Sequence, residues 1–335
     1  MAKSRPREVS ILMPYKNEAL HLEECIKSII HQSFRDWELI AINDHSSDEG
    51  PSILSYFSSR DERIMSINND GKGVIEALRS GMKQSSGKFI SRMDADDIMD
   101  PDKIKVLRET LMNSGSGYVA TGCVKYFSDT ELGDGYLKYE AWLNSLTRSD
   151  SNFDDIYLEC TIPSPCWMMY KSDLMKCGAF GSDLYPEDYD LAFRMKKANL
   201  QVIGINDVLH LWRDHPERSS RVSPLYEDNK YNHLKVMYFL ELEFKEQFPL
   251  IIWGAGKKGK IIAKEFIRLD VPFRWITNNS NKTGLKIYDQ LIEPPSILSS
   301  CGPAQVIIGF STFHDPDTFE GIKKAYPEHK IFRFY

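Results

Sequence analysis

Short apolar runs alternate with amphipathic segments along the first part of the chain. Residues 9–13 and 37–42 are almost wholly apolar, which is typical of buried strands, and residues 18–30 between them repeat apolar positions at helical spacing. A strand, a helix and a strand within ~35 residues form a βαβ unit, and such units build parallel sheets. The pattern then recurs, which predicts helices at residues 52–59 and 74–83 and strands at residues 63–67 and 87–93.

The pattern is vaguer after residue 115. Strands are expected at residues 118–122 and 202–205 and a helix at residues 188–198, whereas residues 132–155 show no clear period. A new set of apolar runs then predicts a helix at residues 261–269 and strands at residues 250–253, 273–276 and 306–309.

These patterns predict an α/β protein with two domains. We expect a mostly parallel sheet flanked by helices in residues 1–235, a linking helix at residues 236–248, and a small Rossmann-like α/β domain in residues 249–335.

Composition narrows the class of protein. The 335 residues carry a formal net charge of -6, which argues against a duplex nucleic-acid partner but not against an anionic nucleotide neutralised by a metal. No apolar stretch is long enough for a signal peptide or a membrane span, and the six cysteines are scattered. We therefore expect a soluble, cytoplasmic protein with reduced thiols, in contact with a membrane surface at most.

Carboxylates follow the fourth predicted strand in the order Asp94-Ala95-Asp96-Asp97. Two carboxylates at this spacing can face one hard cation, and Mg²⁺ and Mn²⁺ prefer oxygen ligands. The alternative is an acidic turn or the cap of a helix beginning near Pro101.

Asn43 and Asp44 lie at the end of the second predicted strand, within the run Asn43-Asp44-His45-Ser46-Ser47-Asp48. The aspartate can accept an N–H of a nucleobase, and small hydroxyl side chains fit close to a ribose. An ordinary turn rich in Asp, Ser and Asn is the other interpretation.

Two further polar stretches follow. Glu187 and Asp188 precede a predicted helix, either as helix-capping residues or with one of them as a base for a hydroxyl. Residues 211–221 hold His215 and three arginines, which suits a metal and a diphosphate, or else forms a solvated basic loop.

A glycine motif, Gly254-Ala255-Gly256-Lys257-Lys258-Gly259, stands between a predicted strand and a predicted helix. The strand that follows the helix ends in Asn278 and Asn279, where a ribose-binding acid is expected. A structural or regulatory domain is therefore favoured over an NAD site.

The order of these sites resembles glycosyltransferase family 2. The opening residues 9–18, the run from Ile29 to Phe34 into residues 37–40, and the Asp94–Asp97, Glu187-Asp188 and His215 motifs carry the resemblance, which covers about residues 8–222. It implies a GT-A fold and an inverting, metal-dependent transfer of a sugar from a nucleotide diphosphate.

The resemblance also implies roles for single residues, listed here by role. The nucleoside pocket would include Pro14, Tyr15, Asn17 and Glu18, with Asp44 on the uracil and Asn68 and Lys72 over the base; Asp94 and Ala95 would lie at the ribose or sugar side; Asp96 and His215 would bind Mn²⁺ or Mg²⁺; Asp188 would be the catalytic base. Asn43 departs from the commoner aspartate of the family.

The arrangement with Trp253-Gly254-Ala255-Gly256-Lys257-Lys258-Gly259 after the transferase region resembles the UDP-GlcNAc:β-Gal β-1,3-N-acetylglucosaminyltransferase-like proteins. That group implies a UDP-sugar donor, UDP-GlcNAc by its name, and a glycan or lipid-linked glycan acceptor. A non-catalytic nucleotide-sugar-binding scaffold and a sugar nucleotidyltransferase stay as alternatives, and a homo-oligomer is left open.

Overall fold

The structure is a computed structural model that describes residues 6–129, 131–218, 231–312 and 316–335. Its contacts divide the chain into two compact units. The first unit comprises residues 1–153 and 161–223, and the second comprises residues 154–160 and 224–335. Residues 154–160 thus join the second unit although they lie within the range predicted for the first domain, and the predicted domain ranges stay a prediction.

The first unit is built on an eight-stranded sheet with the strand order β3-β2-β1-β4-β7-β6-β8-β5. Its first half is parallel: β1 (Val9–Tyr15) pairs with β2 (Trp37–Asn43) and β4 (Phe89–Arg92), and β2 pairs with β3 (Ile64–Asn68). These are the four strands that the apolar runs predict, so that part of the prediction is confirmed.

The second half of the sheet is mixed. β7 (Trp167–Tyr170) runs antiparallel between β4 and β6 (Tyr118–Phe127), while β8 (Gln201–Arg213) is parallel to β6 and antiparallel to β5 (Ile98–Met99). The strand predicted at residues 202–205 is therefore longer than expected. Residues 211–213, assigned from the sequence to a basic stretch or loop, form the end of β8.

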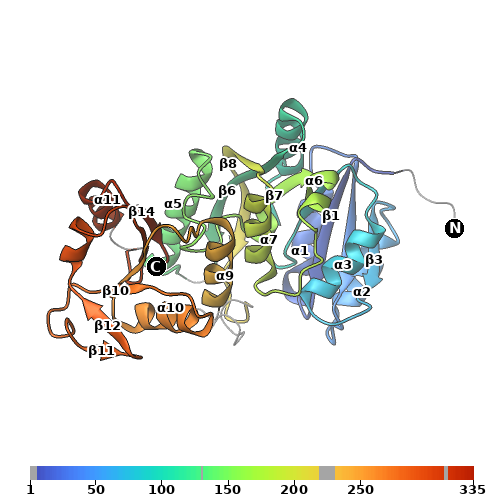
Figure 1. The fold of residues 1–335 in the computed structure, drawn as a ribbon. Coiled ribbons are helices and arrows are strands. Elements are labelled where there is room, and N and C mark those ends of the chain that lie inside the picture. Colours follow the sequence, from blue (N-terminus) through green and yellow to red (C-terminus); the bar gives the residue numbers. More distant parts are fainter. Residues whose placement is uncertain (1–5, 130, 219–230, 313–315) are drawn as a thin grey trace. The chain divides into compact units, whose positions relative to one another are not determined.

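Helices cover both faces of the parallel strands, and α1 and α3 lie on opposite sides of them (Figure 1). α1 (Ala19–Ile30), α2 (Gly50–Ser58) and α4 (Lys103–Ser114) pack on alternate residues of β1 and β2, among them Val9, Ile11 and Met13. α3 (Val74–Gln84) packs on the other face, where a Cβ on Gly81 would contact Leu12 and Ile42. Both faces are thus buried, which explains the continuous apolar runs.

The remaining elements of the first unit are α5 (Asp134–Arg148), η1 (Ser164–Cys166), α6 (Lys171–Lys176) and α7 (Glu187–Lys197). The carboxyl ends of β1, β2 and β4 all lie at one edge of the sheet because these strands are parallel. Ligands of open α/β sheets bind beyond such ends.

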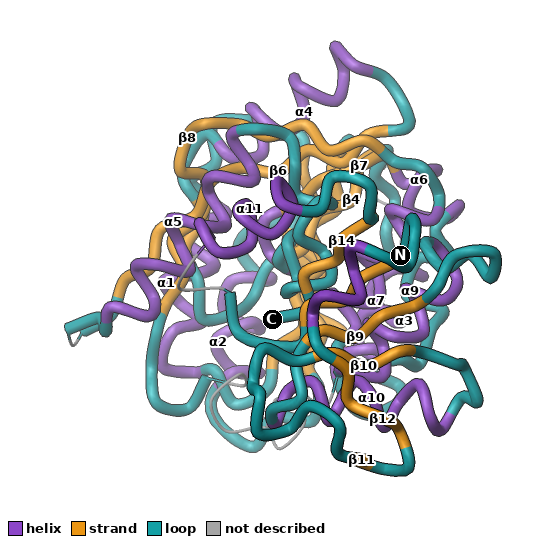
Figure 2. The backbone as a smooth tube through the Cα atoms, turned by 60° about the vertical axis from the view of Figure 1, so that its left-hand side comes forward, coloured by secondary structure: helices purple, strands orange, loops and turns teal. Residues whose placement is uncertain are grey.

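The second unit contains a six-stranded sheet with the order β11-β12-β10-β9-β13-β14, and Figure 2 shows β9, β10 and β12 side by side. The strands are β9 (Leu250–Trp253), β10 (Arg274–Ile276), β11 (Lys286–Ile287), β12 (Gln290–Glu293), β13 (Gln305–Ile308) and β14 (Lys330–Arg333). All neighbouring strands are parallel except β11 and β12. The helices are α9 (Asn232–Leu242), α10 (Lys257–Arg268), η3 (Pro295–Ser299) and α11 (Pro316–Ala325).

The glycine motif connects β9 to α10. A Cβ placed on Gly259 would lie 1.8 Å from the carbonyl oxygen of Gly254, so only glycine allows this approach of the helix to the loop. The same carbonyl accepts a hydrogen bond from Trp275 Nε1 at 2.7 Å. The loop is thus closely packed on its own unit.

Within the described ranges, every helix is too short or too polar to cross a membrane. None of the six cysteines, all of which lie within the described ranges, forms a disulfide.

Candidate functional site

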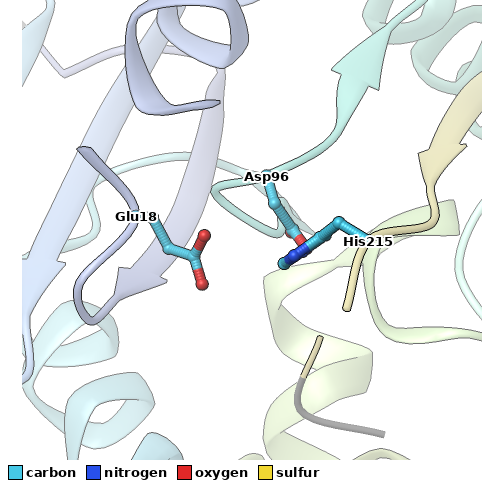
Figure 3. Close-up of side chains that lie close together, drawn as sticks. All are labelled: Glu18, Asp96 and His215. Carbon is cyan, nitrogen blue, oxygen red and sulfur yellow. The ribbon is translucent and has the colours of Figure 1, made fainter. Parts of the chain in front are cut away.

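Three potential metal ligands meet at the carboxyl edge of the first unit's sheet. Glu18 immediately precedes α1, Asp96 follows β4, and His215 follows β8, and Figure 3 shows their side chains converging. One ligand atom from each lies within 4.8 Å of the others, and His215 Nε2 is 3.0 Å from Asp96 Oδ2. Two carboxylates and one imidazole can hold a divalent cation, and the carboxylate oxygens are the ligands that Mn²⁺ and Mg²⁺ prefer.

Negative charge is crowded at this place. Burial, followed by the charges of Asp96, Asp48, Asp94 and Glu217, raises the pKa of Glu18 to about 8. A bound cation would relieve this repulsion and favour the ionised carboxylate. Glu18, which the resemblance places in the nucleoside pocket, is therefore also a potential third metal ligand.

A buried polar network holds the turn that carries Asp96. Asp97 is fully buried and accepts hydrogen bonds from His210 Nε2 at 2.8 Å and from the backbone N–H of Arg213 at 2.7 Å. Lys103 Nζ lies 3.0 Å from His210 Nδ1 and donates to the carbonyl of Pro165. Burial and the charge of Lys103 hold the pKa of His210 well below its usual range, so the ring is neutral.

This network corrects one sequence interpretation. Asp97 does not cap the helix that follows, because α4 begins at Lys103 and its N-cap position is Asp102. Asp97 instead joins the end of β4 to β8, which places Asp96 and His215 on adjoining segments.

The turn before α1 is fixed by the loop after β2. Asp48 Oδ2 accepts from the backbone N–H of Ala19 at 2.7 Å, and its Oδ1 accepts from Gly50 N at 3.0 Å. Asn17 has a left-handed backbone, with φ of 58°, and its side-chain oxygen accepts from Ser47 N at 2.8 Å. These bonds set the direction of Glu18.

The residues expected around the nucleoside lie on the neighbouring loops. Asp44 is buried, and its carboxylate accepts from Asn69 Nδ2 at 2.7 Å and from Gly73 N at 2.9 Å. Asn68 and Lys72 are exposed, and Asn68 Oδ1 accepts from Asn43 Nδ2 at 3.3 Å. The loop of residues 68–73 is thereby tied to the end of β2.

Tyr15 and Ala95 are buried and Pro14 is half-buried. Pro14 and Tyr15 end β1, and Ala95 belongs to the Asp94–Asp97 turn that follows β4.

The arginines of residues 211–221 lie in different surroundings. Arg213 is buried and donates to the carbonyl of Asp96 at 2.8 Å, and the guanidinium of Arg218 lies 4.5 Å from the centre of the Trp212 ring. Arg221 lies outside the described residues.

Asp188 stands in the first turn of α7. Its Oδ2 accepts from Ser164 Oγ at 3.1 Å, and its Oδ1 accepts from the backbone N–H of Tyr189 at 2.8 Å. Burial and the neighbouring Glu187 carboxylate raise the pKa of Asp188 to about 7. A carboxyl with such a pKa is suited to accept a proton near neutral pH.

Sequence reasoning missed several residues that shape the site, namely Arg92, Ser164, His210 and Asp48 as a cap of α1. Arg92 was detectable in principle, because a charged residue ends an otherwise apolar run before Asp94. The others gave no signal, since their partners are far away along the chain.

Residues 10–178 match the family model described as Glycosyl transferase family 2. The chain belongs to glycosyl transferase family 2. Of the curated relatives, it is 32% identical over 256 residues to the uncharacterized glycosyltransferase EpsJ of Bacillus subtilis, which covers 75% of this chain and 72% of EpsJ.

Two further relatives are named as glycosyltransferases. Glycosyltransferase GlyA of Streptococcus pneumoniae is 25% identical over 64% of this chain and 32% of its own length. A GalNAc(5)-diNAcBac-PP-undecaprenol beta-1,3-glucosyltransferase of Campylobacter jejuni is 26% identical over 57% of this chain and 60% of its own length. The chain thus spans about a third of GlyA.

Solved structures share the fold of this family 2 chain. S. aureus TarS 1-349 in complex with UDP-GlcNAc matches with a TM-score of 0.56 and 14% identity, over 72% of this chain and 68% of that one. Mannosyltransferase PcManGT of Pyrobaculum calidifontis, in complex with GDP-Man and Mn²⁺, matches with a TM-score of 0.54 and 17% identity, over 79% and 71%. At these identities the likeness establishes the GT-A fold.

Proposed function

We propose that this chain transfers a sugar from a UDP-sugar to a hydroxyl of a glycan or lipid-linked glycan, with inversion at the anomeric carbon. The convergence of Glu18, Asp96 and His215 carries the proposal. It provides a cation site at the sheet edge where a nucleotide diphosphate of a family 2 enzyme is expected.

The reaction is a single displacement. Asp188 takes the proton of the acceptor hydroxyl while that oxygen bonds to the anomeric carbon, and the bond from this carbon to the diphosphate oxygen breaks. UDP leaves, and one displacement inverts the configuration. A divalent cation held by Asp96, His215 and Glu18 would offset the charge of the departing diphosphate.

The donor side is assigned to the residues of β1, β2 and their loops. Asp44 would accept the N–H of uracil through the carboxylate that Asn69 and Gly73 already orient. Asn68 and Lys72 would cover the base, Pro14, Tyr15 and Asn17 would line the pocket, and Asp94 with Ala95 would face the ribose or sugar. UDP-GlcNAc is the proposed donor, by resemblance to the β-1,3-N-acetylglucosaminyltransferase-like proteins.

The acceptor proposal is supported by a relative. The Campylobacter jejuni enzyme is named for a polyprenyl-diphosphate-linked glycan. We propose the same class of acceptor, which would bring the protein to the cytoplasmic face of a membrane.

The test is calorimetric titration of the purified chain with UDP, UDP-GlcNAc, UDP-Gal, UDP-Glc and GDP-Man, with and without Mn²⁺. Metal-dependent binding of UDP is expected, with UDP-GlcNAc the tightest of the sugar nucleotides. Transfer or donor hydrolysis should then fall ~10²–10⁴-fold in Asp188→Asn. Folded protein that binds no nucleotide would refute the proposal and favour a scaffold, whereas binding without turnover by any donor would favour a nucleotide-sugar-binding protein.

A further inference from the structure

Arg92 is a buried charge at the end of β4, two residues before Asp94. Only 8% of its side chain is exposed. Burying a guanidinium costs free energy unless carboxylates and hydrogen bonds compensate for the lost water. Its surroundings therefore need a physical explanation.

The guanidinium joins two parts of the site. One of its terminal nitrogens donates to Glu187 Oε1 at 2.8 Å, and the other lies 3.7 Å from Asp94 Oδ1. The Glu187 side chain is also buried, with 11% exposed. This ion pair connects the turn that carries Asp94 with the first turn of α7, across 95 residues of sequence.

The pair has a clear electrostatic effect on its neighbour Asp188. Burial and the negative charge of Glu187 raise the pKa of Asp188, and the positive charge of Arg92 opposes them. The Ser164 hydroxyl and the Tyr189 backbone N–H also face this carboxylate and lower its pKa. Arg92 and Glu187 thus act on Asp188 with opposite signs.

Stability alone does not account for the pair. A buried ion pair is weak evidence for stability, because apolar side chains of similar volume often serve as well or better. Arg92 Nε is buried and has no hydrogen-bond partner among the described residues, which adds to the cost of burying this side chain. Because this unfavourable burial lies beside Asp94 and Asp188, it points to a role of Arg92 in the site.

We propose that Arg92 and Glu187 form a positioning pair for the transfer reaction, which holds the first turn of α7, and with it Asp188, against the donor side of the site. The inference rests on the proposed function. Neither residue is assigned contact with the reacting atoms: both act through the placement and charge of Asp188.

The experiment compares Arg92→Met, Arg92→Lys, Glu187→Gln and the Arg92→Met/Glu187→Met double variant with the wild type. For each, UDP binding with Mn²⁺ is measured by calorimetry, kcat and KM are measured with the donor that the wild type uses, and kcat/KM is followed against pH. Thermal melting reports folding.

Arg92→Met should lower kcat by ~10-fold or more and move the acid limb of the pH profile to higher pH, because the base loses its opposing positive charge. Glu187→Gln should move the same limb to lower pH, because a negative charge is removed. UDP binding should change by less than ~3-fold in both, and Arg92→Lys should restore part of kcat. A merely structural pair would not shift the limb in opposite directions.

The double variant should be less impaired than the sum of the single effects, since both act through one residue. An acid limb in Glu187→Gln that is identical to the wild-type limb would overturn the inference, and this conservative variant suffices if Arg92→Met does not fold. A wild type that neither binds UDP nor turns over a donor would instead overturn the proposed function, and the positioning role with it.

Discussion

His215 Nε2 lies 3.0 Å from Asp96 Oδ2, although 119 residues separate the two along the chain. Asp96 precedes β5 by two residues, His215 follows β8 by two, and β5 pairs antiparallel with β8. The contact therefore depends on the pairing of β5 with β8. The cation site is thus built by segments that are far apart along the chain rather than by a local motif.

Loss of either ligand should weaken metal binding and, with it, metal-dependent nucleotide binding. Asp96→Asn and His215→Ala should each weaken Mn²⁺-dependent UDP binding by at least ~10-fold, or ~1.4 kcal/mol, and weaken binding of Mn²⁺ alone as well. Calorimetry with Mn²⁺, and then with UDP at saturating Mn²⁺, measures both. Asp289→Asn, an exposed carboxylate of the second unit, is the matched control. Unchanged Mn²⁺ affinity in both ligand variants would remove this site.

Transfer activity should depend on pH through Asp188. Since the pKa of this carboxyl is raised to about 7, it holds its proton below that pH and cannot accept one from the acceptor. kcat/KM should therefore fall about tenfold for each pH unit below ~7 and level off above it. The profile is measured at saturating metal, and Asp183→Asn, whose side chain is 87% exposed, should leave it unchanged. A flat profile between pH ~5 and ~7 would exclude Asp188 as the base.

The network beneath the metal site should contribute to stability. His210→Leu deprives Asp97 of a hydrogen-bond donor and Lys103 of a neighbour, all three being buried. We expect a loss of ~2 kcal/mol or more, seen as a fall of ~4–8 °C in the melting midpoint of the first unit. The exposed His31 provides the control His31→Leu. Equal midpoints for the two variants would show that the network is dispensable.

Asp48 should contribute both to the free energy of unfolding and to the affinity of the site for Mn²⁺. Asp48→Ala removes the acceptor of Ala19 N–H at the start of α1, which should cost ~1 kcal/mol. Because the same turn directs Glu18, Mn²⁺ affinity should fall too, and Asp48→Asn should retain part of both. Melting and calorimetry on the two variants provide the check, and an Asp48→Ala protein with wild-type Mn²⁺ affinity would contradict the link between the cap and Glu18.

The parallel half of the sheet was predictable because its strands are buried on both faces and read as continuous apolar runs. β7 is four residues and β5 is two, too short to show a pattern. The bounds of α5 were not predictable because its buried face includes Asn144 and Thr147 beside Leu143 and Leu146, so apolar residues alone do not trace its period.

The site was predictable only in part. Asp44, Asp94 and Asp96 follow strands, and their placement at the sheet edge came from the pattern itself. The meeting of Glu18, Asp96 and His215 depends on contacts between distant segments, for which spacing carries no information. The role of Arg92 was overlooked although a charged residue ends an apolar run there, because its partner Glu187 lies 95 residues away along the chain.

The contact between Gly254 and Gly259 gives the glycine motif of the second unit a meaning of its own. The carbonyl of Gly254 occupies the place where any side chain on residue 259 would begin, and Trp275 holds that carbonyl there. Substitution at residue 259 would force the helix away from the strand whatever else the unit does. In this chain, the spacing of the glycines reflects how closely the loop and the helix must approach each other. A steric requirement therefore explains this glycine pattern before any bound molecule is invoked.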